Sequence, residues 1–156
     1  MLSSDSKDIH RHFMKEALKE ALISYKKNEV PVGCIIVQNN AIIASAHNIR
    51  ETENDPLGHA ELLAIRRAAK KLDSWRLTGC TMYVTLEPCI MCTGAIMDSR
   101  IERLYIGAPD IKRGAVSSFL PVIRERMIPH NVEYEYMQTI SPYILKRFFK
   151  RLRKAE

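Results

Sequence analysis

The segment TLEPCIMCTG, residues 85–94, places two cysteines three positions apart directly after a proline. The residues that lead into it, TMYVTL at 81–86, are β-branched, aromatic and apolar, which predicts a buried strand. A helix is expected over 89–99, and Pro88 suits its first position because proline has no N–H to leave unpaired. The two cysteines then share one face of the first helical turn.

The rest of the chain alternates between helical and extended patterns. Residues 7–27 and 59–72 carry apolar side chains at helical spacing. Residues 32–38 and 41–47 flank Asn39-Asn40, and because asparagine tolerates positive φ they predict a β-hairpin. The remaining expected elements are a strand over 102–108, a loop over 109–114, a short helical stretch over 118–126, a strand over 131–136 and a basic terminal helix. About five strands alternating with helices predict an α/β sandwich with some parallel pairing.

Length and composition favour one compact unit. The 156 residues are 46% hydrophobic, enough for a real core, and we expect residues 1–156 to form a single domain. No stretch has the pattern of a signal peptide, and no apolar run approaches the roughly 18 residues of a membrane span. A soluble cytoplasmic protein without membrane association is therefore expected. Four cysteines, irregularly placed, favour free or metal-bound thiols over a disulfide scaffold.

Positive charge gathers at the C-terminal end. The formal net charge is +6 and the pI is near 9.2. Six of the nine residues over 146–154 are Lys or Arg, with aromatic side chains between them. Such a run is typical either of the solvated face of a terminal helix or of a surface that binds a phosphate backbone. Composition alone does not choose between these two interpretations.

The cysteine pair could serve as a redox pair, as half of a structural metal site, or in a catalytic metal site. His59, at the start of the helix expected over 59–72, favours a metal, because its imidazole supplies a third ligand beside Cys89 and Cys92. A helix N-terminus also lowers thiol pKa values and so helps to present the thiolates that zinc requires. Three protein ligands leave the fourth tetrahedral position open, which is typical of a catalytic site. The sequence therefore predicts one Zn²⁺ per chain.

Three other side chains are candidates for the fourth ligand position of the metal. Cys80 lies roughly 20 Å from Cys89 along an extended strand, too far to bind the same ion. Cys34, among valine and isoleucine, is typical of a small buried apolar side chain. Glu61 lies on a different side of a regular helix from His59, but in the first turn it can lean toward the open position. Its alternative interpretation is an exposed glutamate favoured by the helix dipole.

The order His-x-Glu and then Pro-Cys-x-x-Cys, here HAE at 59–61 and PCIMC at 88–92, resembles the zinc-dependent nucleobase deaminases. Over about residues 10–154, the chain is similar to the bacterial tRNA adenosine deaminases within the cytidine/deoxycytidylate deaminase family. The similar segments are EVPVG (29–33), HNI (47–49), NDPLGHAE (54–61), YVTLEPCIMCTGAI (83–96), SRI (99–101) and GAPDIKRGA (107–115).

This resemblance implies a fold, an assembly and a reaction. The fold is the cytidine-deaminase-like three-layer α/β/α sandwich with a mixed five-stranded sheet, and the assembly is a homodimer. The reaction is hydrolytic deamination of the wobble adenosine in a tRNA anticodon, which gives inosine and ammonia. Zinc activates the water, and Glu61 is the catalytic residue that moves protons between water and base.

The resemblance also assigns substrate contacts within the tRNA anticodon stem-loop. It implies that Asn48 hydrogen-bonds the flipped base, that the backbone near Ala60 and Cys89 contacts the base, and that Asp110 meets the neighbouring ribose. The candidates for holding phosphates, sugars and bases of the loop are Lys112, Arg113, Phe148, Phe149 and Arg151. The two phenylalanines are expected to split their roles, one packing and one stacking.

Five positions depart from the family pattern, and none of them is a metal ligand: Gly58, Pro109, Arg113, Ser117 and Pro121. They touch the rim, so they bear on substrate detail rather than on the chemistry. Three alternatives stay open at this stage. The chain could deaminate free guanine, cytosine or nucleosides, it could be a catalytically silent zinc-containing RNA-binding subunit, or it could be a thiol oxidoreductase.

Overall fold

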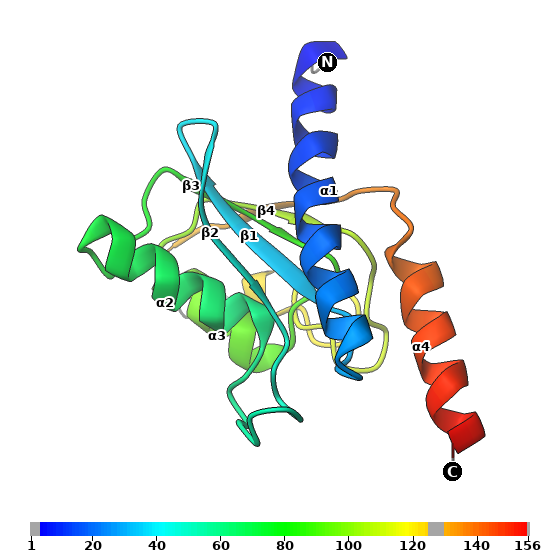
Figure 1. The fold of residues 1–156 in the computed structure, drawn as a ribbon. Helices are drawn as coiled ribbons and strands as arrows, with labels where there is room; N and C mark the ends of the chain where they lie inside the picture. The colour runs from blue at the N-terminus through cyan, green and yellow to red at the C-terminus, as the bar shows by residue number, and fades with distance from the viewer. Residues whose placement is uncertain (1–3, 125–129, 156) are drawn as a thin grey trace.

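A five-stranded mixed sheet forms the centre of the computed structural model, which describes residues 4–124 and 130–155. The strand order is β2-β1-β3-β4-β5 (Figure 1). Strand β1 (Gly33–Gln38) is antiparallel to β2 (Ala41–His47) and to β3 (Cys80–Val84). Strands β3, β4 (Arg103–Ile106) and β5 (Glu133–Tyr136) are parallel. The predicted mixed five-stranded sheet is confirmed.

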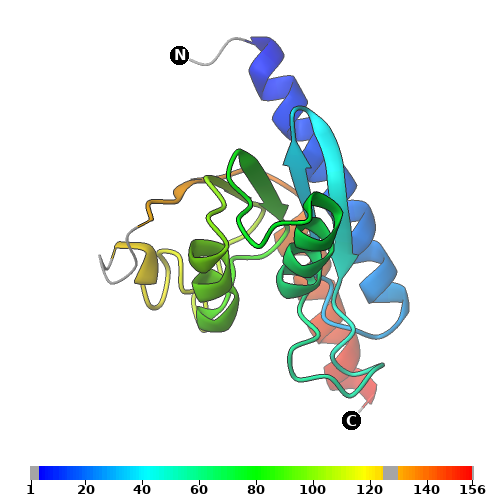
Figure 2. The ribbon, with the colours of Figure 1, turned by 90° about the vertical axis from the view of Figure 1, so that its left-hand side faces the viewer.

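Helices cover both faces of this sheet (Figures 1 and 2). Because successive residues of a strand point to opposite faces, Ile35 and Val37 pack with helix α1 (Ser4–Lys26). Cys34 and Ile36 pack on the other face, with α2 (Ala60–Leu72) and alongside α3 (Ile90–Asp98). Helix α4 (Ser141–Ala155) lies beside α1. None of the helices in the described ranges is long and apolar enough to cross a membrane.

The expected elements are present with small shifts at their ends. The hairpin turn has positive φ at both Asn39 and Asn40, as predicted. The helix predicted over 89–99 begins one residue later than expected, at Ile90, because Cys89 is the extended N-cap residue; Pro88 therefore lies before the helix and not at its first position. The stretch predicted as helical over 118–126 holds a 3₁₀ helix at Val122–Arg124, and its residues 125 and 126 lie outside the described residues.

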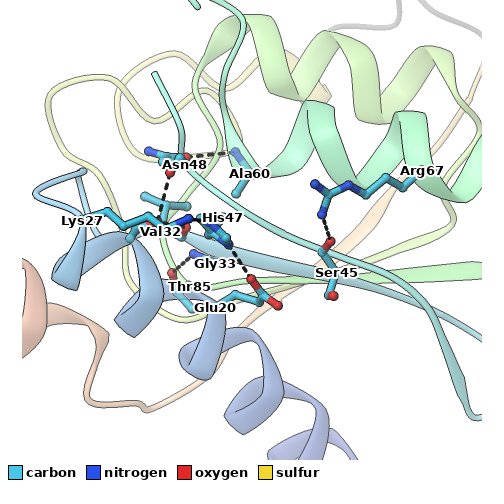
Figure 3. Close-up of polar contacts among 11 residues, drawn as sticks. Glu20, Lys27, Val32, Gly33, Ser45, His47, Asn48, Ala60, Arg67 and Thr85 are labelled. Atoms are coloured by element: carbon cyan, nitrogen blue, oxygen red, sulfur yellow. Dashed lines mark hydrogen bonds and ion pairs between the residues drawn. The ribbon is translucent and has the colours of Figure 1, made fainter. Parts of the chain in front are cut away.

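One glycine allows the first helix to approach the central strand closely. A Cβ atom at Gly33 would lie 2.0 Å from the carbonyl oxygen of Ala17 in α1, so no other residue fits there without a shift of the backbone. The Gly33 N–H donates to Thr85 Oγ1 at 3.0 Å (Figure 3). This bond ties the start of β1 to the residue that follows β3, and therefore to the edge of the sheet from which α3 departs.

Candidate metal centre

The first residues of two helices bring three candidate metal donors together. His59 is the N-cap residue of α2 and Cys89 that of α3, both with extended backbone, and Cys92 lies in the first turn of α3. His59 Nδ1 is 3.7 Å from Cys89 Sγ and 3.5 Å from Cys92 Sγ. All three ligand atoms lie within 4.8 Å of one another. The structure thus brings together the residues that the sequence predicts as metal ligands.

These distances fit a tetrahedral zinc ion. Zinc–sulfur bonds of about 2.3 Å and a zinc–nitrogen bond of about 2.0 Å at the tetrahedral angle separate nitrogen from sulfur by about 3.5 Å. Neither of the other two cysteines joins the group: Cys34 and Cys80 are fully buried free thiols in strands β1 and β3. Three donors at one point, two of them thiols, match a zinc site with an open fourth position.

The cysteine pair is set up to carry a thiolate. Hydrogen bonding with Cys92 is the largest influence on Cys89, and together with the bond to His59 it outweighs burial and lowers the pKa of Cys89 to about 3. The same hydrogen bond, followed by burial, raises the pKa of Cys92. The two thiols therefore share a proton when no cation is bound, and a divalent cation that displaces this proton completes the site.

Glu61 lies in the wall of the same site with one oxygen unpaired. Its side chain is 4% exposed, and Glu61 Oε2 has no hydrogen-bond partner among the described residues. Burial raises the pKa of this carboxyl to about 7. The exposed-glutamate interpretation is therefore wrong. An unpaired buried carboxylate oxygen is costly for folding, so its retention beside a metal site points to a role in chemistry.

A cavity of about 710 Å³ opens from the metal donors. Its wall includes His59, Glu61 and Cys89, and it extends across the loop after β4 to helix α4. Of the residues predicted to contact substrate, those that line it are Asn48, Asp110, Lys112, Arg113 and Phe149. Lys146 and Arg153, from the basic run of α4, line it as well. Metal donors, a free carboxylate and a basic aromatic wall thus face one space.

Asn48 is held in one orientation at the edge of this cavity (Figure 3). Its Oδ1 accepts the N–H of Ala60 at 2.9 Å, and its own N–H donates to Val32 at 3.2 Å. The side-chain NH₂ group is therefore the end that remains available to a ligand. Ala60 does not line the cavity, and its N–H already donates to Asn48 Oδ1. This N–H is therefore not available for the backbone contact with a base that the resemblance implies near Ala60.

The residue before Asn48 fastens the same strand end to helix α1. His47 Nδ1 lies 2.7 Å from Glu20 Oε2, and His47 Nε2 lies 3.3 Å from Lys27 Nζ (Figure 3). A neutral imidazole that donates to the carboxylate and accepts from the ammonium group satisfies both neighbours. The end of β2, and with it Asn48, is thereby fixed against α1, which lies on the face of the sheet opposite to α2.

The family model of the cytidine and deoxycytidylate deaminase zinc-binding region matches residues 7–108. The chain belongs to this deaminase family. It is 45% identical over 146 residues to a tRNA-specific adenosine deaminase of Bacillus subtilis (strain 168), with 92% of this chain and 91% of that protein covered.

Solved structures agree with the family. A chain from structural studies of A-to-I editing by tRNA:A34 deaminases superposes with a TM-score of 0.79 at 41% identity, covering 82% of this chain and 98% of that one. Guanine deaminase from Bacillus subtilis superposes with a TM-score of 0.62 at 30% identity, covering 88% and 93%. The predicted family and the cytidine-deaminase-like fold are confirmed. The predicted zinc cofactor is also confirmed, since the family region is zinc-binding and the three-donor group is consistent with one Zn²⁺ per chain.

In helix α4 of this deaminase, one of two neighbouring phenylalanines is buried and the other is exposed. Phe148 is 1% exposed and packs edge-on against Tyr25 of α1, with ring centroids 6.0 Å apart. Phe149 is 42% exposed and lines the cavity. Phe148 thus takes the packing position of the pair that was expected to split its roles, and its ring lies in the core rather than in the cavity wall, which Phe149 lines.

Arg151 is also placed differently from the prediction. Its guanidinium donates to the backbone oxygen of Tyr25 at 3.1 Å and to Asn28 Oδ1 at 2.9 Å, and it stacks over the Tyr25 ring. It lines a second cavity of about 510 Å³ on the other side of α4, together with Lys146, Lys150 and other residues. Arg151 thus fastens α4 to α1 and is not part of the wall around the metal donors.

Sequence reasoning missed two buried glutamates that line the cavity, Glu29 and Glu87. Glu29 accepts hydrogen bonds from the backbone N–H of Thr52 at 2.7 Å and from its hydroxyl at 2.9 Å, which holds the loop between β2 and α2. Glu87 directly precedes Pro88 and Glu29 lies two positions before Pro31, each in a mostly apolar segment, TLEPC and EVPV. A charge in such a setting is the signal that could have marked them as buried and paired.

Gly58, one of the rim departures, allows the loop before His59 to pack closely on itself. A Cβ atom at Gly58 would lie 3.0 Å from both the Arg50 nitrogen and the Asp55 oxygen, so a larger residue needs a shift of this loop by a few tenths of an ångström. Ser117, another departure, uses its hydroxyl to contact Tyr136 Oη at 2.7 Å, and this contact braces the rim.

We expect the purified deaminase to hold about one zinc ion per chain, and Cys89→Ala to lose it. Two remaining donors bind zinc far more weakly than three, because each thiolate supplies both charge and a ligand bond. Elemental analysis of dialysed protein gives the stoichiometry.

The matched control is Cys80→Ala, which removes a buried thiol outside the donor group and should keep the full zinc content. Undiminished zinc in Cys89→Ala, or its loss in Cys80→Ala, would show that the ligand assignment is wrong.

Proposed function

We propose that the chain is a zinc-dependent tRNA adenosine deaminase that converts the wobble adenosine of an anticodon to inosine and ammonia. One observation carries the proposal: the unpaired Glu61 Oε2 lies beside three metal donors, in a cavity whose far wall is the basic helix α4. The similarity to the tRNA-specific adenosine deaminase of Bacillus subtilis supports this substrate. A tRNA substrate also makes the cytoplasm the proposed location.

The chain's own groups perform the proton transfers. His59, Cys89 and Cys92 would hold the zinc ion, which when bound would supply a water whose pKa is lowered toward about 7. Glu61 takes a proton from the water as the water oxygen bonds to carbon 6 of adenine, holds this proton at Oε2 and delivers it to ring nitrogen 1. The same carboxylate then moves the remaining proton from the new hydroxyl on carbon 6 to the amino group, so that the C–N bond breaks, ammonia leaves and Glu61 is again ionised. Its raised pKa suits a group that must both accept and donate near neutral pH.

The cavity holds a base that has been turned out of its loop. The NH₂ group of Asn48 donates to an acceptor on the base, while its Oδ1 stays occupied by Ala60. Phe149, exposed in the cavity wall, offers a ring on which a neighbouring base can stack. Asp110 presents its carboxylate to the ribose. Single-stranded loops are read in this way because their bases are free to leave the stack.

Uncompensated positive charge on α4 favours an RNA substrate over a free base. Among the residues described, no side chain of α4 takes part in an ion pair. Lys146 borders both cavities, so basic side chains run from the metal centre across α4 to its other side. A phosphate backbone uses such a surface, whereas free guanine or cytosine has no phosphate to place there.

We extend the proposal to a homodimer in which both subunits contribute substrate contacts, as the family resemblance implies. Large apolar side chains next to the ligands are exposed, among them Leu57 before His59 and Ile90 after Cys89. Exposed apolar side chains of this size mark surfaces for association when they gather in one region. Sedimentation equilibrium is expected to give the mass of two chains, and a monomer mass at assay concentrations would contradict the dimer.

Glu61→Gln is expected to keep its zinc and to lower kcat for inosine formation by at least about 100-fold, because the amide cannot move a proton. The assay measures inosine at the wobble position of an anticodon stem-loop, with free guanine and cytosine as parallel substrates. Glu53→Gln, an exposed change in the loop before α2, serves as the control and should stay active.

Three outcomes would contradict the proposal. Unchanged activity in Glu61→Gln removes the carboxyl from the chemistry. Turnover of a free base without turnover of the stem-loop identifies a free-base deaminase similar to the guanine deaminase of Bacillus subtilis. A zinc-loaded wild-type protein that turns over no substrate is a silent RNA-binding subunit.

Replacing both Lys146 and Arg153 by alanine should weaken stem-loop binding and make it less dependent on salt. Each lost phosphate contact lowers the slope of log K against log salt by about 0.7–0.9. Fluorescence anisotropy over a salt series measures this slope. Lys70→Ala, an exposed cation near the end of α2, should leave the slope unchanged; equal slopes for the double variant and the wild type would exclude α4 from phosphate binding.

A further inference from the structure

Glu87 is a buried carboxylate that the proposed chemistry does not use. It lies in the connection between β3 and α3, two residues before the ligand Cys89, and its side chain is 2% exposed. Burying a carboxylate is costly unless hydrogen bonds replace its water. The hydrogen bonds that Glu87 accepts therefore have to offset the free-energy cost of its burial.

Four backbone N–H groups of one loop donate hydrogen bonds to this carboxylate. Glu87 Oε1 accepts from Val116 at 3.2 Å, Ser117 at 2.8 Å and Ser118 at 3.0 Å. Glu87 Oε2 accepts from Asp110 at 2.9 Å. The loop that follows β4 is thus wrapped around a single carboxylate, with one oxygen serving three donors and the other serving one.

The same loop is pressed against the segment that carries the metal ligand. Gly114 pairs with Cys89 as an isolated β-bridge, and the Ala115 N–H donates to the Pro88 oxygen at 2.8 Å. A Cβ atom at Gly114 would lie 2.3 Å from Glu87 Cδ, so glycine is needed for the loop to pass this close. Loop and ligand segment are therefore fixed relative to each other around Glu87.

Asp110 is rigidly attached to this arrangement. Its Oδ1 accepts from the N–H groups of Lys112 at 3.0 Å and Arg113 at 3.1 Å, which sets the side chain relative to its own loop. Its backbone N–H is fixed by Glu87 Oε2. In the part of the chain that the structure describes, Oδ2 of Asp110 accepts no hydrogen bond, and the residue lines the cavity. A continuous set of bonds thus runs from the ligand segment through Glu87 to the carboxylate that faces a substrate.

We propose that Glu87 is a positioning residue that holds Asp110 at a set distance from the metal centre, and so fixes where the ribose of a substrate lies relative to Glu61. This inference rests on the proposed function, because the contact between Asp110 and ribose belongs to it. Displacement of a bound group by about 1 Å can cost about 100-fold in rate. A carboxylate with two acceptor oxygens suits the task, since it serves both ends of the loop at once.

The Glu87→Gln variant tests this at nearly constant shape. The carbonyl oxygen of the amide keeps the three bonds to residues 116–118, which leaves the NH₂ group facing the Asp110 N–H, donor against donor. Zinc content should stay at about one per chain. The value of kcat/KM for an anticodon stem-loop should fall about 10-fold or more, mostly through kcat, because a displaced ribose moves the base relative to Glu61. Hydrogen exchange at the Asp110 amide should accelerate while the amides of residues 116–118 stay protected.

A double-mutant cycle with Asp110→Ala separates positioning from general support of the fold. If Glu87 acts through Asp110, adding Glu87→Gln to Asp110→Ala should change kcat/KM by less than about 2-fold. The matched control is Glu29→Gln, which loosens the other loop through Thr52 and should add its full effect to that of Asp110→Ala.

Additive losses for Glu87→Gln and Asp110→Ala would overturn the inference, and so would an unchanged exchange rate at the Asp110 amide. If Glu87→Gln fails to fold or to hold zinc, Glu87→Asp replaces it in the same cycle, because its shorter side chain keeps the charge but withdraws the carboxylate from the Asp110 amide; additive losses there would overturn the inference as well. Failure of the proposed function has a different signature. Wild-type protein would then not deaminate the stem-loop, while amide exchange would still decide whether Glu87 holds Asp110.

Discussion

The direction of three neighbouring strands is the constraint on which the site depends. Strands β2 and β3 are both antiparallel to β1, so they run in the same direction and end at the same edge of the sheet. The chain leaves β2 through Asn48 toward α2, and it leaves β3 through Glu87 toward α3. Two helix N-termini therefore meet at one point, with His59 and Cys89 as their N-cap residues. Residues 30 positions apart become neighbours because the sheet has this topology.

Three buried glutamates near this point differ in how well their carboxylates are hydrogen-bonded. Glu29 and Glu87 both exchange their water for backbone N–H groups, and in doing so each holds a loop. Glu61 is buried as well, but its Oε2 has no partner among the described residues. The first two stabilise the walls of the cavity. The third is left with a net cost to folding, which is typical of a group kept for reactivity rather than for stability.

Local patterns in the sequence predict most of the fold and the metal donors. Alternating apolar residues, Asn39-Asn40 and the helical stripes locate the elements, and the spacing of His59, Cys89 and Cys92 predicts the ligand group. The start of α3 was misplaced by one position, because Pro88 is compatible both with the first helical turn and with the extended residue before a cap. The partners of Glu87 could not be predicted, since its donors lie 23 to 31 positions further along the chain and nothing local marks them. The split between Phe148 and Phe149 likewise depends on where α1 lies. The substrate roles of Asn48, Asp110, Lys112, Arg113 and Phe149 stay predictions.

Helix α4 and the metal donors come from different parts of the chain but border the same cavity. The metal donors and Glu61 all come from residues 59–92, whereas one wall of the cavity comes from the last 15 helical residues. These residues are fastened to α1 through the Phe148 ring and the Arg151 guanidinium. The outward face of a terminal helix can accumulate substitutions without disturbing the donors of the metal. A scaffold of this kind can adapt to a different substrate through changes in its last helix, because none of the metal donors lies there.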